Sequence, residues 1–171
     1  MAAYGLTKLQ IINQVLPRMR EGTVATSSST VYAALVSAGL NTVRTQIEQA
    51  WAWKDLRDTY TVTVTPGTTS YSLTSSGQFA KILDIWNTTS DGEVGPGSFH
   101  DFNERFFAND TVATGNVREY NVAGLDSNYD LQIDTWPNVT STNILKVNLY
   151  LPQQDPTSDS TVILVPNQIL I

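Results

Sequence analysis

The sequence predicts an α+β protein in which N-terminal helices, including one long amphipathic helix, carry an antiparallel β-sandwich or barrel of six or seven short strands. Three observations lead to this prediction. Apolar residues recur every three or four positions in the first third of the chain, and every second position in most of the remainder. Thr and Ser supply 22 and 14 of the 171 residues, whereas charged residues supply only 15%. This composition favours sheets with a polar outer face.

The N-terminal third is expected to hold two helices. Over 6–16, Thr7 and Gln10 have the spacing of a capping box, and Pro17 interrupts the helix. The polar connector 23–30 ends in Ser and Thr residues that suit a helix N-cap. In the long helix that follows, apolar residues step by three and four and predict one continuous stripe. The stripe consists of Tyr32, Leu35, Val36, Leu40, Val43, Ile47 and Trp51.

From Tyr60 onward the pattern is typical of strands, because apolar and polar residues alternate. The turn at Pro66 and Gly67 predicts a hairpin whose return strand contains Tyr71 and Leu73. A strand at 79–87 has apolar residues on both faces, which indicates burial on both sides. A Gly-rich loop (88–98), one or two helical turns (99–107), three strands (117–124, 129–136 and 143–151) and a short apolar run (161–166) are expected next.

We therefore divide the chain into a helical assembly region (1–57), a β-sandwich domain (58–165) and the start of a C-terminal helix or tail (166–171). The charge follows this division. Residues 1–57 hold six basic and three acidic side chains, whereas the remainder holds four basic and thirteen acidic ones, for a net charge of −6. Such a division indicates two regions with different partners. The acidic remainder disfavours nucleic-acid binding, which requires clustered Lys and Arg.

The sequence offers little for catalysis or metal binding. It has no cysteine, and its one histidine, His100, has no second His or Cys to complete a metal site. Asp126, Asp130 and Asp134 are four residues apart, without the alternate spacing of a calcium loop, so a solvated strand face is favoured over calcium. No nucleophile motif or phosphate loop is present. We expect no enzyme activity, no metal and no cofactor, and we see no signal peptide or membrane span.

The order of features resembles a known family. A long helix ends in "AWAW", and a Thr-rich hairpin follows with a tyrosine on its return strand. Then come "AKILDIW", the aromatic helix "FHDFNERFF", "GNVREY", "LQIDTWP", "VNLYLP" and "ILVPNQI". This order resembles the head-to-tail adaptor (connector) proteins of tailed bacteriophages, of the tail tubular protein A type. The single residues that carry the resemblance are Trp51, Tyr71, Gly115, Tyr120, Pro137, Tyr150 and Pro166.

The resemblance implies a structural virion protein of the neck, made in the host cytoplasm, without enzyme activity and without a membrane. Such adaptors form a homo-oligomeric ring, usually a dodecamer, between the portal protein and a tail, nozzle or stopper protein. The ring extends the channel through which genomic DNA passes without specific binding. Two alternatives remain open: another β-rich phage tail or baseplate component, and a soluble β module that binds carbohydrate or peptide.

Two groups of residues receive roles in this interpretation. Large apolar side chains are expected to pack against one another at a hinge where the helix meets the sheet. Trp51 is expected to point inward there because it continues the apolar stripe. Trp53 lies off the stripe and is expected to meet a neighbouring subunit. The hinge group is Val43, Ile47, Trp51 and Trp86. The assembly and partner group is Arg18, Arg20, Tyr32, Arg44, Trp53 and Arg57.

Overall fold

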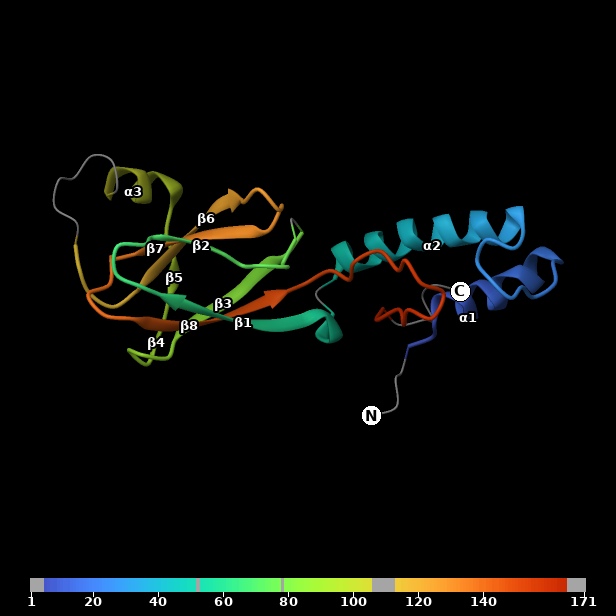
Figure 1. The fold of residues 1–171 in the computed structure, drawn as a ribbon, viewed down its shortest axis with the longest axis horizontal. Coiled ribbons are helices and arrows are strands. Elements are labelled where there is room, and N and C mark those ends of the chain that lie inside the picture. The colour runs from blue at the N-terminus through green and yellow to red at the C-terminus, as the bar shows by residue number, and fades with distance from the viewer. Residues whose placement is uncertain (1–4, 52, 78, 106–112, 166–171) are drawn as a thin grey trace. The chain divides into compact units, whose positions relative to one another are not determined.

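A computed structural model describes residues 5–51, 53–77, 79–105 and 113–165 (Figure 1). The chain forms two compact units. The helical unit comprises Met1–Leu56 together with Pro152–Ile171, and the β unit comprises Arg57–Leu151. The sequence places 152–165 in the β domain, but the structure places this stretch, here called the return segment, in the helical unit. The expected tail, 166–171, lies outside the described residues.

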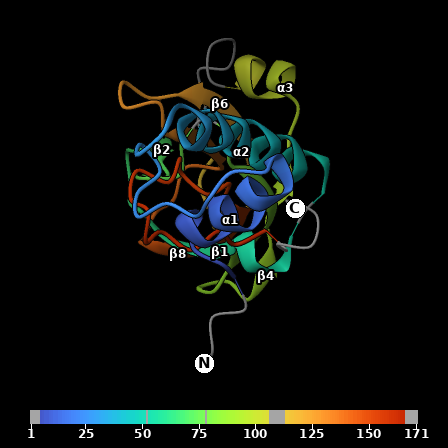
Figure 2. The same ribbon diagram turned by 90° about the vertical axis from the view of Figure 1, so that its right-hand side faces the viewer.

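The helical unit is built from two helices whose N-termini are capped as expected. Its elements are α1 (Lys8–Val15), the 3₁₀ helix η1 (Leu16–Met19), α2 (Val31–Ala50) and the 3₁₀ helix η2 (Lys54–Leu56). The capping box is confirmed: Thr7 N donates to Gln10 Oε1 at 2.9 Å, and Gln10 N donates to Thr7 Oγ1 at 3.3 Å. Thr30 caps α2 by accepting from Ala33 N at 3.1 Å. In Figure 2, α1 lies beside α2.

The return segment is held against the start of α1 by backbone hydrogen bonds. Lys8 N donates to Thr161 O at 2.9 Å, and Ile163 N donates to Leu6 O at 3.0 Å. The expected apolar strand near the end of the chain is reduced to one isolated bridge, Thr7 to Val162. Pro152 interrupts the preceding strand because proline cannot donate to a ladder. Beyond it, the segment depends on partners in the helical unit.

Two small cores fill the helical unit. One joins α1, α2 and the return segment, and the other joins α1, η1 and the start of α2. The first contains Ile11, Leu40, Ile163 and Val165, with Leu6, Ile47 and Trp53 packed against it. The second contains Ile12, Leu16 and Ala33, with Val24 and Val36 packed against it.

The β unit contains two four-stranded sheets. The first has the order β1-β8-β3-β4 and the second β2-β7-β6-β5. All neighbouring strands pair antiparallel except β5 and β6, which are parallel. Among the described residues neither sheet closes into a barrel. The strands are β1 (Arg57–Val64), β2 (Ser70–Ser72), β3 (Lys81–Asn87), β4 (Gly92–Glu93), β5 (Gly95–Pro96), β6 (Glu119–Leu125), β7 (Leu131–Trp136) and β8 (Asn143–Tyr150). The helix α3 (Phe99–Asn103) lies against β6.

The expected hairpin pairing between β1 and β2 is wrong. β1 pairs with β8, and β2 pairs with β7, so the turn between β1 and β2 carries the chain from one sheet to the other. Gly67 has the positive φ, 81°, that the turn requires. The Tyr71 hydroxyl accepts from Thr65 N at 2.9 Å and donates to Thr68 O at 2.7 Å, which closes the turn. Alternation therefore predicted the strands but not their partners.

One apolar core draws on both sheets. It includes Val62, Ile85 and Leu145 from the first sheet and Ile133 and Tyr120 from the second. The expectation that 79–87 is buried on both faces is wrong, because Leu83 and Trp86 are 43% and 42% exposed while Ile85 is buried. The β3 strand therefore has one inner and one outer face.

Candidate assembly surface on the helical unit

The long helix α2 has two different faces. Its buried residues are Ala33, Leu40, Arg44 and Glu48, so half of this face is charged. Much of the predicted stripe lies elsewhere on the helix. Tyr32, Leu35 and Val43 are 48%, 63% and 41% exposed, and Val31 next to them is 84% exposed. We call these four residues the exposed apolar face. The single continuous stripe is thus divided between core and surface.

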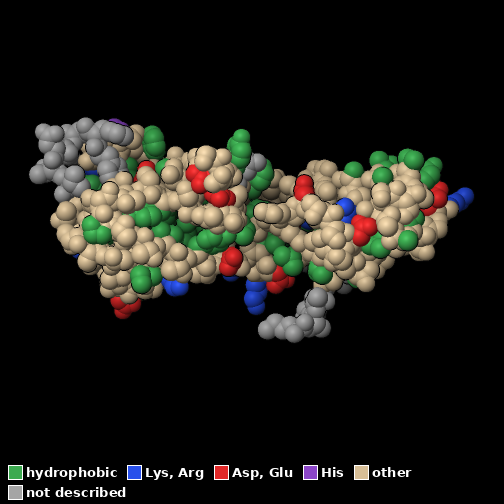
Figure 3. Space-filling view, in the orientation of Figure 1, with side chains coloured by type: hydrophobic (Ala, Val, Ile, Leu, Met, Phe, Trp, Pro, Cys, Tyr) green, Lys and Arg blue, Asp and Glu red, His purple; other side chains and the backbone are tan. Residues whose placement is uncertain are grey.

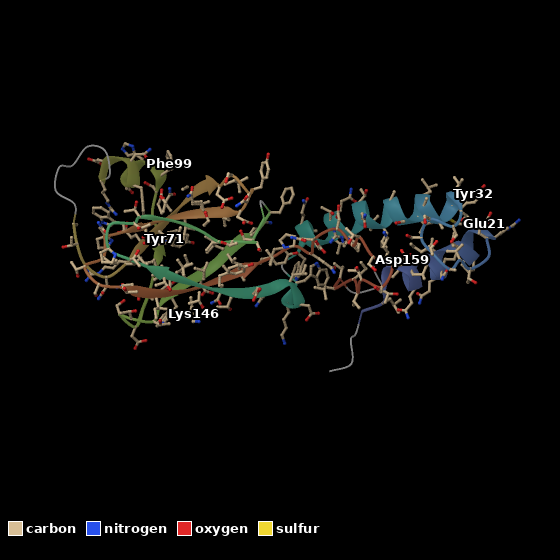
Figure 4. All side chains as sticks on the ribbon, in the orientation of Figure 1. Glu21, Tyr32, Tyr71, Phe99, Lys146 and Asp159 are labelled. Atoms are coloured by element: carbon tan, nitrogen blue, oxygen red, sulfur yellow. The ribbon has the colours of Figure 1, made fainter. Side chains whose placement is uncertain are left out.

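The exposed apolar face is accessible along α2. Hydrophobic side chains gather on the surface over the first turns of α2 (Figure 3), and Tyr32 projects from the helix (Figure 4). Gly39 lies between Leu35 and Val43 in the helical spacing, and a Cβ at Gly39 would meet only open space. The glycine therefore leaves a low point on this face, where another backbone can approach closely.

Arg44 anchors the return segment and is not a surface residue. Its side chain is only 2% exposed. Nη1 donates to the carbonyl oxygens of Gln153 and Gln154, the latter at 3.1 Å, and Nη2 pairs with Asp155 Oδ1 at 2.5 Å. A buried guanidinium requires such partners because its desolvation is costly. Arg44, expected at a partner interface, is therefore occupied within the chain.

Glu48 follows Arg44 by one helical turn and is equally buried, at 2% exposure. Its Oε1 lies 3.6 Å from Arg44 Nη1. Burial raises the pKa of the Glu48 carboxyl, although Arg44 and a backbone hydrogen bond from Gln153 partly oppose this rise. The pair lies beneath the return segment, and its ionisation state is linked to the stability of that packing.

Two further polar contacts hold the return segment. Lys8 is 8% exposed, and its Nζ donates to Pro156 O at 3.2 Å. Asp159, labelled in Figure 4, accepts from Ser27 N at 3.0 Å, and hydrogen bonds from Ser27 lower the pKa of the Asp159 carboxyl. Charged side chains thus hold the return segment, which contains no helix or strand among its described residues. They are Lys8 from α1, Arg44 from α2 and Asp159 from the segment itself.

The structure reverses the expected roles of the two hinge tryptophans within the helical unit. Trp51 is 69% exposed. Trp53 is half-buried, packs against the core shared by α1, α2 and the return segment, and donates from Nε1 to Ile47 O at 3.1 Å. The reason is that α2 ends at Ala50 and Trp51 is extended (φ −147°, ψ 143°), so helical spacing no longer predicts its direction.

Part of the expected assembly group lies at one end of the helical unit. Arg18 and Arg20 are exposed in and just after η1, which shares a core with the start of α2. Figure 4 shows the neighbouring Glu21 at the same end as Tyr32. The structure therefore places Arg18, Arg20 and Tyr32 at the same end of the helical unit. In sequence they are separated by the connector, so only the packing of Leu16 against α2 could reveal this.

One residue of the assembly and partner group, Arg57, and one of the hinge group, Trp86, lie in the β unit. Arg57 is exposed at the start of β1. Trp86 lies on β3, opposite Lys146 on one side and Glu93 on the other. A hinge contact of Trp86 with Val43, Ile47 and Trp51 would join the two units and stays a prediction.

The acidic residues of the β6–β7 turn serve the backbone. Asp126 Oδ1 accepts from Asn128 N at 2.8 Å and from Asp130 N at 3.0 Å, and the bond from Asp130 is the main cause of a lowered pKa at Asp126. The Asp130 carboxylate accepts from Ser75 N at 2.9 Å and Gly77 N at 3.0 Å. His100 is exposed in α3. Over the described stretches, no three His, Cys, Asp or Glu side chains converge as metal ligands.

Comparison with protein-family models matched no family, and comparison with curated proteins found no relative. Among the helices that the structure describes, none is long and apolar enough to cross a membrane. The candidate site therefore rests on the geometry of the helical unit.

The reversed tryptophans give a matched pair of substitutions. Trp53→Ala should lower the free energy of unfolding by about 2–3 kcal/mol, because it removes a packed indole and its hydrogen bond to Ile47 O. Trp51→Ala should change it by less than about 0.5 kcal/mol, because this indole is exposed. Urea unfolding of both variants measures the difference. A larger loss for Trp51→Ala would show that the tryptophan assignment is incorrect.

The raised pKa of Glu48 predicts a pH dependence. A carboxyl whose folded pKa exceeds its unfolded pKa stabilises the fold fully below the unfolded pKa, and this contribution is lost as pH rises through the folded pKa. Glu48→Gln removes that titration while keeping the size of the side chain. The stability of the Gln variant relative to the natural protein should therefore increase between pH 4 and pH 7. Chemical unfolding at several pH values tests this, with exposed Glu104→Gln as the control. A difference that does not change with pH would contradict it.

Proposed function

We propose that this chain is a structural virion protein, a head-to-tail adaptor that forms a ring, usually a dodecamer, between portal and tail. The observation that carries the proposal is the exposed apolar face of α2. Tyr32, Leu35 and Val43 remain exposed although α1 and the return segment already cover the opposite side of the helix. Exposed apolar patches on rigid elements are typical of protein interfaces.

The form of this face supports a helical partner. Apolar residues at helical spacing form the type of ridge that packs into the groove of another helix. Gly39 provides open space at the centre of the ridge, so a second helix can approach the α2 backbone there. Helices of the portal protein, or α2 of a neighbouring copy in the ring, are the partners that we propose for this face.

Charge supports a division of partners between the units. Arg18 and Arg20 lie at the Tyr32 end, which favours an acidic portal surface. Residues 58–171 carry four basic and thirteen acidic side chains, and this balance suits a channel through which DNA passes without binding. We propose that the β unit faces the tail, nozzle or stopper protein, and that the protein resides in the virion neck.

The proposal includes a sandwich arrangement of the two sheets. Support comes from the core, which receives buried side chains from β1, β3 and β8 on one side and from β6 and β7 on the other. A compact module of this kind suits a structural role, which requires a stable surface and no reacting group.

Disruption of the exposed apolar face tests the proposed function. Leu35→Glu should abolish assembly, because it places a charge at the centre of a face that must lose its water. Its effect on the free energy of unfolding should be within about 0.5 kcal/mol, because Leu35 is 63% exposed. Gln14→Glu adds the same charge at an exposed polar position of α1, away from the exposed apolar face, and is the control.

Native mass spectrometry of the full chain, alone and mixed with the portal protein encoded by the same genome, provides the measurement. We expect a monomer alone and a ring on the portal, with the ring retained in Gln14→Glu and lost in Leu35→Glu. Assembly of Leu35→Glu at the natural level would exclude the exposed apolar face as the contact. Absence of any complex with the portal would contradict the adaptor function itself.

A further inference from the structure

The outer face of the first sheet carries an ordered grid of polar side chains beside one tryptophan. Register places Thr61, Lys146 and Trp86 in one row across β1, β8 and β3. The next row holds Thr59, Asn148 and Asp84. Neighbouring strands are about 4.8 Å apart and alternate residues on a strand about 6.7 Å apart, so the six side chains cover an area comparable to one or two sugar rings.

Hydrogen bonds between side chains hold the polar part of this grid in place. Asn148 accepts from the Thr59 hydroxyl at 2.6 Å and donates from Nδ2 to Asp84 Oδ1 at 2.5 Å. Lys146 Nζ donates to Thr61 Oγ1 at 2.6 Å. Lys146 is labelled on this face in Figure 4. Fixed polar groups bind a ligand with less loss of conformational entropy than mobile ones do.

Trp86 adds an aromatic surface to the grid. Its side chain is 42% exposed, directly opposite Lys146 on β8 and Glu93 on β4. An indole in a half-buried position on a sheet is held by its neighbours and offers part of its apolar surface to a ligand. The row of Trp86 and the row of Asp84 lie on the same face of β3, so one ligand can contact both.

We propose that this face is a binding site for a neutral, β-1,4-linked glycan. Sugar rings have an apolar face of C–H groups that can lie on an indole, and hydroxyl groups at their edges that pair with carboxylate, amide and ammonium groups. Asp84, Asn148 and Lys146 supply these three groups next to Trp86. A β-1,4-linked chain is extended and can follow neighbouring rows of the grid, whereas an α-1,4-linked chain coils away from them.

Charge favours a neutral glycan over an anionic polymer. Within the grid and beside it, one cation, Lys146, stands among two carboxylates, Asp84 and Glu93, which disfavours a polyanion. Binding of a polyanion requires clustered Lys and Arg, and the two rows of the grid provide only one cation. The proposed site lies wholly in the β unit, and it is independent of the exposed apolar face on α2.

The test uses the full chain labelled with ¹⁵N and titrated separately with cellohexaose, chitohexaose and maltohexaose. We expect the β-linked cellohexaose or chitohexaose to shift the Trp86 indole N–H resonance and the Asn148 side-chain amide at millimolar concentration. Trp86→Ala should weaken this binding about tenfold or more, and Trp86→Tyr should restore part of it. Val122→Ala, which shortens an exposed apolar side chain of β6 in the second sheet, should change the affinity less than about twofold.

Each other outcome overturns the inference. If neither β-linked hexamer shifts the Trp86 resonance, the site is excluded. Equal binding of maltohexaose would exclude the proposed selectivity for an extended chain. Equal weakening by Val122→Ala would show a non-specific apolar contact. Leu35→Glu should leave the titration unchanged, so failure of this inference and failure of the adaptor function can be distinguished.

Discussion

The helical unit depends on the buried guanidinium of Arg44. Within α2 this cation has one charged neighbour, the Glu48 carboxylate at 3.6 Å. Its hydrogen-bond partners come from more than a hundred residues later in the chain: the carbonyls of Gln153 and Gln154 and the carboxylate of Asp155. Leaving such a charge unpaired would cost several kcal/mol. The return segment therefore has to reach α2 for this unit to form, and the β unit is inserted between the two parts.

The same constraint explains why α2 has an unused apolar face. Arg44 and Glu48 commit one side of the helix to the return segment, together with Leu40. The apolar residues that remain, Tyr32, Leu35 and Val43, lie outside the two cores that the described residues form. A helix that is fixed internally by polar groups and presents apolar groups outward suits a role in assembly, because its contact surface is rigid before any partner arrives.

Local signals in the sequence were sufficient for the two N-terminal helices and their caps, as the capping box of Thr7 and Gln10 shows, and for most of the strands. The short strands β4 and β5 were missed, because they lie within the expected Gly-rich loop 88–98. Long-range partners were not predictable from them. The alternation after Tyr60 indicates strands but does not reveal that β1 and β2 enter different sheets. The spacing of apolar residues does not reveal a buried cation, so Arg44 was expected at a partner interface on the surface. Trp51 was misplaced because helical spacing fails once the helix ends.

The central claim is that Arg44 couples the return segment to α2, and native-state hydrogen exchange tests it most directly. In Arg44→Leu, the amides of Lys8 and Ile163, which hold the return segment to the start of α1, should lose protection together. The amide of Leu145, in the middle of β8, should keep the protection that it has in the natural protein. Unchanged protection at Lys8 and Ile163, or an equal loss at Leu145, would contradict the claim.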